Sequence, residues 1–224
     1  FNKMTEEVLI PKMKRIEKQQ RKLKIPFLNI LLVLFCSLLI IGATFINIDL
    51  KHYIIPTTIF SDNHLTAEDF IYSFYIIPQV PVIMFICSTL GKKMAATSII
   101  LYILGGLFLA PIFALGGGIR YITEYSFGYI FAYLPAVVFA GSFLKKSYSF
   151  KNMILAAITG VLTIHILGII YMTIIACLKH AGTVFITGWI DAQSGLKILY
   201  DLILSFICII IGKYIHYALK FIME

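Results

Sequence analysis

Long apolar runs separated by short polar segments are the main pattern along this chain. Five charge-free stretches of 20 to 27 residues follow one another, at 25–48, 70–91, 94–119, 125–144 and 152–178. A sixth begins near Gly195, carries Lys197 and Asp201 close to its start, and continues to about Leu219. A helix needs about 20 apolar residues to cross the roughly 30 Å of hydrocarbon in a bilayer. The pattern therefore predicts an all-α integral membrane protein, a bundle of six transmembrane helices.

The composition also indicates that lipid is the solvent for most of the chain. Of 224 residues, 60% are hydrophobic and 13% are charged, whereas soluble domains average about 45–50% apolar and about 25% charged residues. So few charges cannot cover a soluble domain of this size, and the richness in Ile, Leu, Phe and Tyr excludes a disordered chain. The net charge of +8 does not indicate nucleic-acid binding, because the cations lie between the apolar runs instead of forming one patch.

The positions of the charges predict the orientation in the membrane. With a cytoplasmic N-terminus, 15 of the 19 Lys and Arg residues fall inside and seven of the eleven acidic residues fall outside. This is the positive-inside distribution, so both termini are expected in the cytoplasm. Residues 1–24 are predicted to form a basic cytoplasmic segment and residues 25–224 the membrane domain. The stretch 12–24 is either an interfacial helix attracted to anionic membrane lipid or a solvated tail that fixes the orientation.

The connection 50–69 is predicted to be an exposed outer loop. It contains Pro56, Ser61, Asp62 and Asn63, which favour turns and irregular backbone. A short surface helix is expected to begin near Thr66.

The known signatures of catalysis and cofactor binding do not occur in the sequence. We find no HExxH, CxxC, GxSxG or Walker A motif, and the four cysteines lie inside apolar runs without paired spacing. The chain is therefore predicted not to be an enzyme and to need no metal or cofactor. An intramembrane enzyme is the alternative, and it would require His165 to lie within reach of a nucleophile or a carboxylate.

The connection 115–129 carries the first candidate site. Gly116, Gly117 and Gly118 allow the backbone to turn sharply or to approach a ligand closely. Arg120 follows on the outer side, against the positive-inside bias, and its guanidinium group suits a carboxylate. The alternatives are that Arg120 reaches outer lipid headgroups or pairs with Glu124.

Two further polar residues lie at the outer ends of predicted spans. Pro78 and Pro81 interrupt the helix on either side of Gln79, whose amide would face a cavity. Asp201 is followed by eleven uncharged residues, and it is either an acceptor in an aqueous cavity or the partner of Lys197 one turn earlier. Because these features come from separate spans and share the outer half, they predict one outward-facing pocket, with aromatic residues such as Tyr129 nearby.

Five segments in order resemble the BioY biotin transporters, the substrate-binding S components of energy-coupling-factor transporters. They are IPQVPVIMFICSTLG at 77–91, LYILGGLFLAPIFALGGG at 101–118, FGYIFAYLPA at 127–136, GVLTIHILGIIY at 160–171 and YDLIL at 200–204. The first 70 residues lie outside the resemblance, except that they supply the first helix.

The resemblance implies a six-helix bundle in the bacterial cell membrane with a deep pocket for biotin. It also implies a transmembrane coupling subunit and ATPase subunits as partners, met by the first helix through small residues such as Ser37, Gly42 and Ala43.

Residue roles follow from the same resemblance. Asp201 is similar to the aspartate that contacts the ureido ring, Arg120 to a basic residue that meets the valerate carboxylate, and Tyr129 lies beside the pocket, with Gln79, Gly117 and Gly118 completing the expected site. Leu204 stands where many relatives carry lysine. The alternatives are an S component for another vitamin and a structural or assembly subunit of the membrane.

Overall fold

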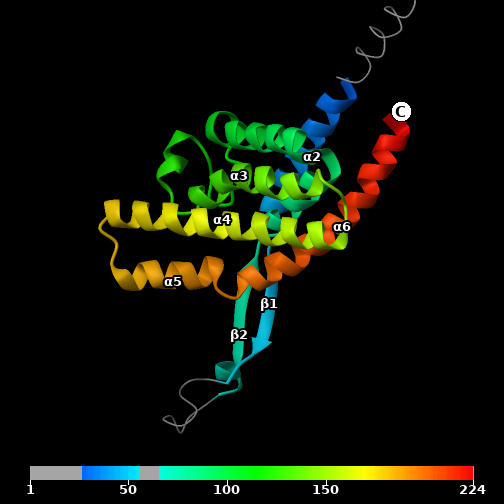
Figure 1. The fold of residues 1–224 in the computed structure, drawn as a ribbon. Coiled ribbons are helices and arrows are strands. Elements are labelled where there is room, and N and C mark those ends of the chain that lie inside the picture. Colours follow the sequence, from blue (N-terminus) through cyan, green and yellow to red (C-terminus); the bar gives the residue numbers. More distant parts are fainter. Residues whose placement is uncertain (1–26, 56–65, 224) are drawn as a thin grey trace, which may run out of the picture.

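Helices form most of the computed structural model, which describes residues 27–55 and 66–223 (Figure 1). The first described helix is Phe27–Thr44. It is followed by α2 (Gln79–Leu104), α3 (Phe127–Leu144), α4 (Phe150–Leu178), α5 (Thr183–Ser194) and α6 (Lys197–Met223). The shorter elements are strands β1 (Ile48–Tyr53) and β2 (Ile71–Ile76) and the single turns η1 (Ala67–Phe70), η2 (Gly105–Leu109) and η3 (Ile119–Thr123). The predicted basic segment 1–24 lies outside the described residues.

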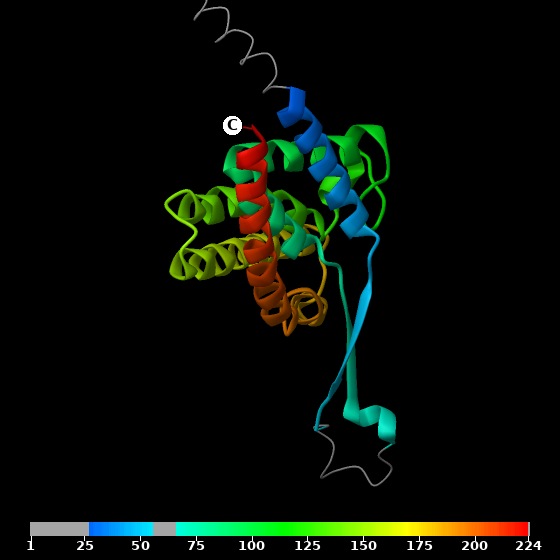
Figure 2. The ribbon, with the colours of Figure 1, turned by 90° about the vertical axis from the view of Figure 1, so that its right-hand side faces the viewer.

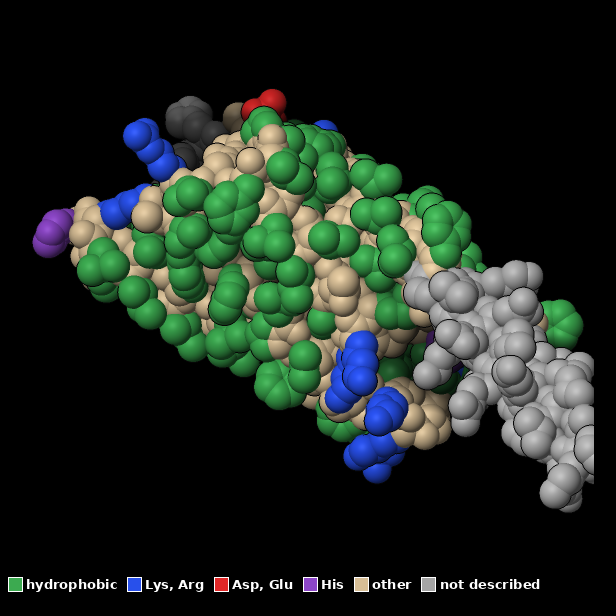
Figure 3. Space-filling model, turned by 90° about the horizontal axis from the view of Figure 1, so that it is seen from above, with side chains coloured by type: hydrophobic (Ala, Val, Ile, Leu, Met, Phe, Trp, Pro, Cys, Tyr) green, Lys and Arg blue, Asp and Glu red, His purple; other side chains and the backbone are tan. Residues whose placement is uncertain are grey.

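The described chain has five helical stretches that are long and apolar enough to cross a membrane. They are Phe27–Thr44, Gln79–Phe108, Phe127–Leu144, Phe150–Leu178 and Thr183–Phe221. Many large apolar side chains on them are exposed, including Leu38, Phe139 and Ile174. Figure 3 shows such a face, on which apolar side chains cover the middle and Lys and Arg side chains lie toward its edges. Helices that are apolar toward both the core and the outside are typical of proteins embedded in lipid.

The helix α2 folds back on itself at Gly91. Gly91 has φ of 75° and ψ of 165°, outside the helical region and readily adopted only by glycine. The amide Nε2 of Gln79 lies 2.9 Å from the hydroxyl of Tyr102, although 23 residues in a straight helix would separate them by about 35 Å. The two arms of α2 are therefore antiparallel, and they correspond to the predicted second and third spans.

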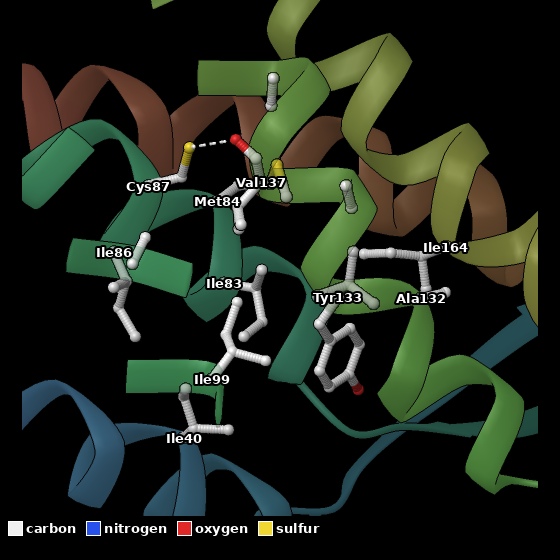
Figure 4. Packing of buried hydrophobic residues seen from close by; sticks show 14 of the residues in the cluster. Ile40, Ile83, Met84, Ile86, Cys87, Ile99, Ala132, Tyr133, Val137 and Ile164 are labelled. Carbon is white, nitrogen blue, oxygen red and sulfur yellow. Dashed lines mark hydrogen bonds between the residues drawn. The ribbon is translucent and has the colours of Figure 1, made fainter. Parts of the chain in front are cut away.

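Buried side chains of both α2 arms pack together and against the first helix. Figure 4 shows Ile83 and Ile86 of one arm near Ile99 of the other, with Ile40 of the first helix beneath them. Cys87 lies in the same core, where its thiol donates to the carbonyl oxygen of Val137 at 3.5 Å (Figure 4). This cluster holds the two arms in place without any charged group.

Small residues allow α3 and α4 to pack closely. A Cβ atom on Gly160 of α4 would lie 3.3 Å from Cβ of Ala140 of α3, and Ala132, Ala136 and Ala156 are fully buried. Close approach of backbones is how helices associate in lipid, where the hydrophobic effect between helices is absent.

The prediction of an all-α fold is wrong for residues 48–53 and 71–76. These residues form an antiparallel hairpin with Ile48 opposite Ile76 and Tyr53 opposite Ile71, and it extends beyond the helices (Figures 1 and 2). The first span therefore ends at Thr44 instead of 48, and the second begins at Gln79 instead of 70. Counting uncharged residues missed the alternation of apolar and polar residues in IDLKHY, which has the period of a strand.

The expected surface helix near Thr66 is present as the short turn η1. The backbone N–H of Thr66 donates to Oδ2 of Asp69 at 2.7 Å, and the Thr66 hydroxyl donates to the same oxygen at 2.8 Å. These two bonds lower the pKa of Asp69. The rest of the expected loop, residues 56–65, lies outside the described residues.

Candidate functional site

A cavity of about 160 Å³ lies where the N-terminal ends of α2, α3 and α6 meet. Its apolar wall includes Ile77, Val80, Leu115, Ile130 and Ile164. Its polar and aromatic lining is Gln79, Tyr121, Ser126, Tyr129, Tyr133, His165, Trp189, Gln193, Lys197 and Asp201. Apolar walls with a few polar groups are the usual lining of a small-molecule site.

Asp201 is the carboxylate of this cavity. Its side chain is fully buried, and Oδ2 lies 3.1 Å from Nε2 of His165. Oδ1 has no hydrogen-bond partner among the described residues. The alternative of an ion pair with Lys197 is not formed, since the Lys197 ammonium instead donates to Oε1 of Gln193 at 3.5 Å. Asp201 thus offers one free acceptor to the cavity.

A chain of hydrogen bonds fixes the orientation of His165 and Asp201. Nδ1 of His165 lies 2.9 Å from the Ser194 hydroxyl, which lies 3.0 Å from the Tyr129 hydroxyl. All these groups are satisfied when Tyr129 donates to Ser194, Ser194 donates to Nδ1, and Nε2–H donates to the Asp201 carboxylate. This series of hydrogen bonds connects α3, α4, the end of α5 and α6, so it holds the cavity wall together.

The order carboxylate, imidazole, hydroxyl is also that of a hydrolase triad, which bears on the alternative of an intramembrane enzyme. Ser194, however, is buried and does not line the cavity. A nucleophile must reach the substrate carbonyl, and we therefore assign Ser194 a structural role.

Gln79 lines the cavity, as predicted, but its amide is already engaged. Nε2 donates to the hydroxyls of Thr44 at 2.6 Å and Tyr102 at 2.9 Å, and Oε1 accepts from the Tyr133 hydroxyl at 3.0 Å. The Gln79 side chain thus ties the first helix, both arms of α2 and α3 together beneath the cavity.

The glycine turn supports the wall of the cavity from behind. Gly116 and Gly118 have positive φ, and a Cβ on Gly117 would lie 2.7 Å from the carbonyl oxygen of Gly106. Neither Gly117 nor Gly118 lines the cavity. The turn instead positions the neighbouring residues Leu115 and Tyr121, which do.

Arg120 is exposed on η3 and does not line the cavity. In the described part of the chain it forms no ion pair with Glu124. Its predicted contact with a carboxylate therefore stays a prediction.

Sequence reasoning missed several residues of this site. His165 was named only for the alternative of an intramembrane enzyme. Ser194, Tyr133, Trp189 and Gln193 were not predicted, and neither was helix α5, which supplies Trp189 and Gln193. One available signal was His165, because an ionisable residue in the middle of an apolar run is functional by default. Within the described ranges no group of three or more His, Cys, Asp or Glu residues could hold a metal ion.

Comparison with known proteins identifies what this chain resembles as a whole. A model described as the BioY family matches residues 17–221. A curated relative from Lysinibacillus sphaericus, named as a probable biotin transporter BioY, is 32% identical over 85 residues, which are 37% of this chain and 43% of the relative. The match thus spans less than half the length of that relative.

A solved structure, described as the S-component for biotin from an ECF-type ABC transporter, has the same fold. It superposes with a TM-score of 0.62 at 22% sequence identity, and the match covers 87% of this chain and 93% of that chain. The chain is thus a multi-pass membrane protein with the S-component fold.

Proposed function

Because this chain belongs to the BioY family, we propose that it is the membrane substrate-binding component for biotin uptake, a transporter component and not an enzyme. The observation that carries the proposal is a pair of buried polar atoms beside one small cavity. Oδ1 of Asp201 is an acceptor and Nε1 of Trp189 a donor, and neither has a partner in the described chain. Buried polar atoms are normally hydrogen-bonded, so a ligand that offers both N–H and C=O groups would satisfy them.

Biotin offers that combination. Its ureido ring has two N–H donors and one carbonyl acceptor, and its thiophane ring and aliphatic chain need apolar walls. We propose that Asp201 accepts a ureido N–H while Tyr129 and Trp189 supply aromatic surface to the rings. Many relatives carry a lysine at the position of Leu204. In this chain we propose that His165 takes the place of that lysine beside Asp201.

The direct test is calorimetric titration of the purified protein with biotin in detergent. Saturable binding with one site per chain is the expected result, and no heat of binding would contradict the proposal. A panel of other vitamins in a thermal-shift assay separates biotin from another ligand on the same scaffold.

We propose that the cavity opens to the outside of a bacterial cell membrane and that the chain crosses this membrane six times. The fold-back of α2 at Gly91 converts the five apolar stretches into six passes. The cavity lies at the N-terminal ends of α2 and α3. Lys92 and Lys93 follow the bend of α2, and Lys145 and Lys146 follow the C-terminal end of α3. The positive-inside rule places these lysines in the cytoplasm.

Uptake would be driven by a transmembrane coupling subunit with ATPase subunits, since the sequence has no Walker A motif of its own. Ser37 and Ala43, expected at the coupling face, are buried within the chain. The exposed side chains of the same helix, such as Phe35 and Leu38, are therefore the proposed contact.

The next prediction tests whether Lys197 or Arg120 binds the carboxylate of the ligand. Lys197 lines the cavity and Arg120 does not. In binding assays with biotin and biotin amide, Lys197→Gln should weaken biotin binding about tenfold more than amide binding, the size of one charge-assisted hydrogen bond. Arg120→Gln should weaken both equally and only slightly. The reverse result, a loss specific to biotin in Arg120→Gln only, would show that Arg120 contacts the carboxylate.

Gly168 gives a second prediction, because it leaves room for the ring of Tyr129. A Cβ at Gly168 would lie 2.4 Å from Cδ1 of Tyr129, too close for a normal contact. Gly168→Ala should displace the ring, break its bond to Ser194 and weaken biotin binding by roughly tenfold. Gly188→Ala on α5, where nothing lies within 4 Å, is the matched control and should bind biotin normally. Equal affinities of the two variants would show that the ring position is unimportant.

A further inference from the structure

A second cavity lies at the other end of the helices and shares no residue with the first. It measures about 470 Å³ and is an open hollow lined by the bend of α2, the end of α3 and the last third of α6. Its polar lining is Lys92, Lys93, Lys145, Tyr148 and His216. Three cations therefore converge on a space that the proposed transport site does not use.

No carboxylate offsets these charges along the chain around the cavity. The stretches 91–94, 141–153 and 210–223 contain no Asp or Glu. The ammonium groups of Lys93 and Lys145 are exposed and make no hydrogen bond or ion pair with any described residue. Lys92 has only a long hydrogen bond, 3.4 Å to the Ser142 hydroxyl. The cavity is therefore electropositive and has unused donors.

The frame around the lysines is well defined. Nδ1 of His216 lies 2.9 Å from the carbonyl oxygen of Thr89, so this nitrogen carries the proton and the ring is fixed. The Tyr148 hydroxyl donates to the carbonyl oxygen of Ser88, and burial raises the pKa of Tyr148 to about 12, so the phenol adds no negative charge. A Cβ on Gly141 would lie 2.6 Å from Cβ of Lys92, so glycine is what allows α3 and the lysine to meet.

We propose that this cavity binds the phosphate group of an anionic phospholipid. Lysine ammonium groups bind phosphate as point charges, and basic pockets between membrane helices suit lipid headgroups. The cavity lies at the ends of the membrane helices, where headgroups are found. Exposed apolar side chains on the adjacent turns, Tyr214 and Tyr217 of α6 and Phe150 of α4, would accept the acyl chains. This inference does not depend on the identity of the transported ligand.

Native mass spectrometry of the delipidated full chain in neutral detergent tests the proposal. Titration with dioleoyl phosphatidylglycerol should give a bound lipid at concentrations at which dioleoyl phosphatidylcholine gives none. Glycerol 3-phosphate is the soluble competitor. If it competes with an affinity equal to that of the lipid, the site binds free phosphate esters. If it does not compete, the site binds the phosphate of a lipid.

Removing charges from the cavity should weaken lipid binding in steps. Lys93→Gln and Lys145→Gln should each cost about fivefold in phosphatidylglycerol affinity, the fold-change expected for one cation near a charged surface. The matched control is Lys179→Gln, which removes the same charge from the far end of α4, where its ammonium group lies 4.6 Å from the ring centre of Tyr125. The thermal unfolding midpoint of the same samples in detergent reports whether each variant is folded.

Two results would overturn the proposal. One is equal binding of phosphatidylglycerol and phosphatidylcholine by the unmodified protein. The other is that both cavity variants, with the unfolding midpoint of the unmodified protein, retain the phosphatidylglycerol affinity of the Lys179→Gln control.

Discussion

Replacing Asp201 with Asn is expected to weaken biotin binding by about a hundredfold or more. The variant keeps the shape of the side chain and can still accept from Nε2 of His165. At the position of the free Oδ1 it places an NH₂ group, which would then face the ureido N–H as a second donor. Losing a charge-assisted hydrogen bond and leaving a buried donor unpaired together cost about 3 kcal/mol.

The measurement is calorimetric titration of Asp201→Asn beside Asp49→Asn. Asp49 is exposed on β1 and does not line the cavity, so its variant loses the same charge without removing a lining side chain. The control should bind biotin as the unmodified protein does. An Asp201→Asn affinity within threefold of the control would show that this carboxylate does not contact the ligand.

Replacing His165 with Leu is expected to destabilise the protein strongly. His165 is the partner of the buried Asp201 carboxylate at 3.1 Å and of the Ser194 hydroxyl at 2.9 Å. Without it, both carboxylate oxygens are buried and unpaired. Removing one partner of a buried pair costs about 3–5 kcal/mol. The thermal unfolding midpoint in detergent should fall accordingly, and biotin binding should be lost.

The double variant His165→Leu with Asp201→Leu separates stability from function. Replacing both partners of a buried hydrogen-bonded pair by apolar residues is often nearly neutral or stabilising, so the double variant should recover most of the lost unfolding temperature. It should still not bind biotin, because the acceptor is gone. A double variant as unstable as His165→Leu alone would mean that His165 stabilises the fold through packing or through Ser194, not through Asp201.

The bend of α2 could be predicted from the charges in the sequence. The sequence predicts a break between the second and third spans, because Lys92 and Lys93 follow Gly91. In the structure the backbone leaves the helical region at Gly91, and the Gln79 to Tyr102 hydrogen bond requires a reversal of direction there. The charges thus predicted the turn correctly, since a pair of lysines is costly in the middle of a bilayer.

The hairpin shows the opposite case. Residues 71–76 are uncharged and were counted as helix, but IYSFYI is rich in β-branched and aromatic residues, which favour strands. Its partner β1 lies 18 or more residues earlier, so the pairing depends on a contact that a count within one segment does not include.

The sequence by itself determined the solvent of this protein, the order of its apolar segments, and three side chains of the cavity: Asp201, Gln79 and Tyr129. These follow from composition and local pattern, because a charge or a proline inside an apolar run is costly wherever the run packs. Only the tertiary structure decided which groups share the cavity. It brought His165 and Trp189 to Asp201 from other helices and left Arg120 and the glycine turn outside the lining. Such contacts depend on the packing of helices distant in sequence, and neither the spacing nor the charge of the residues contains that information.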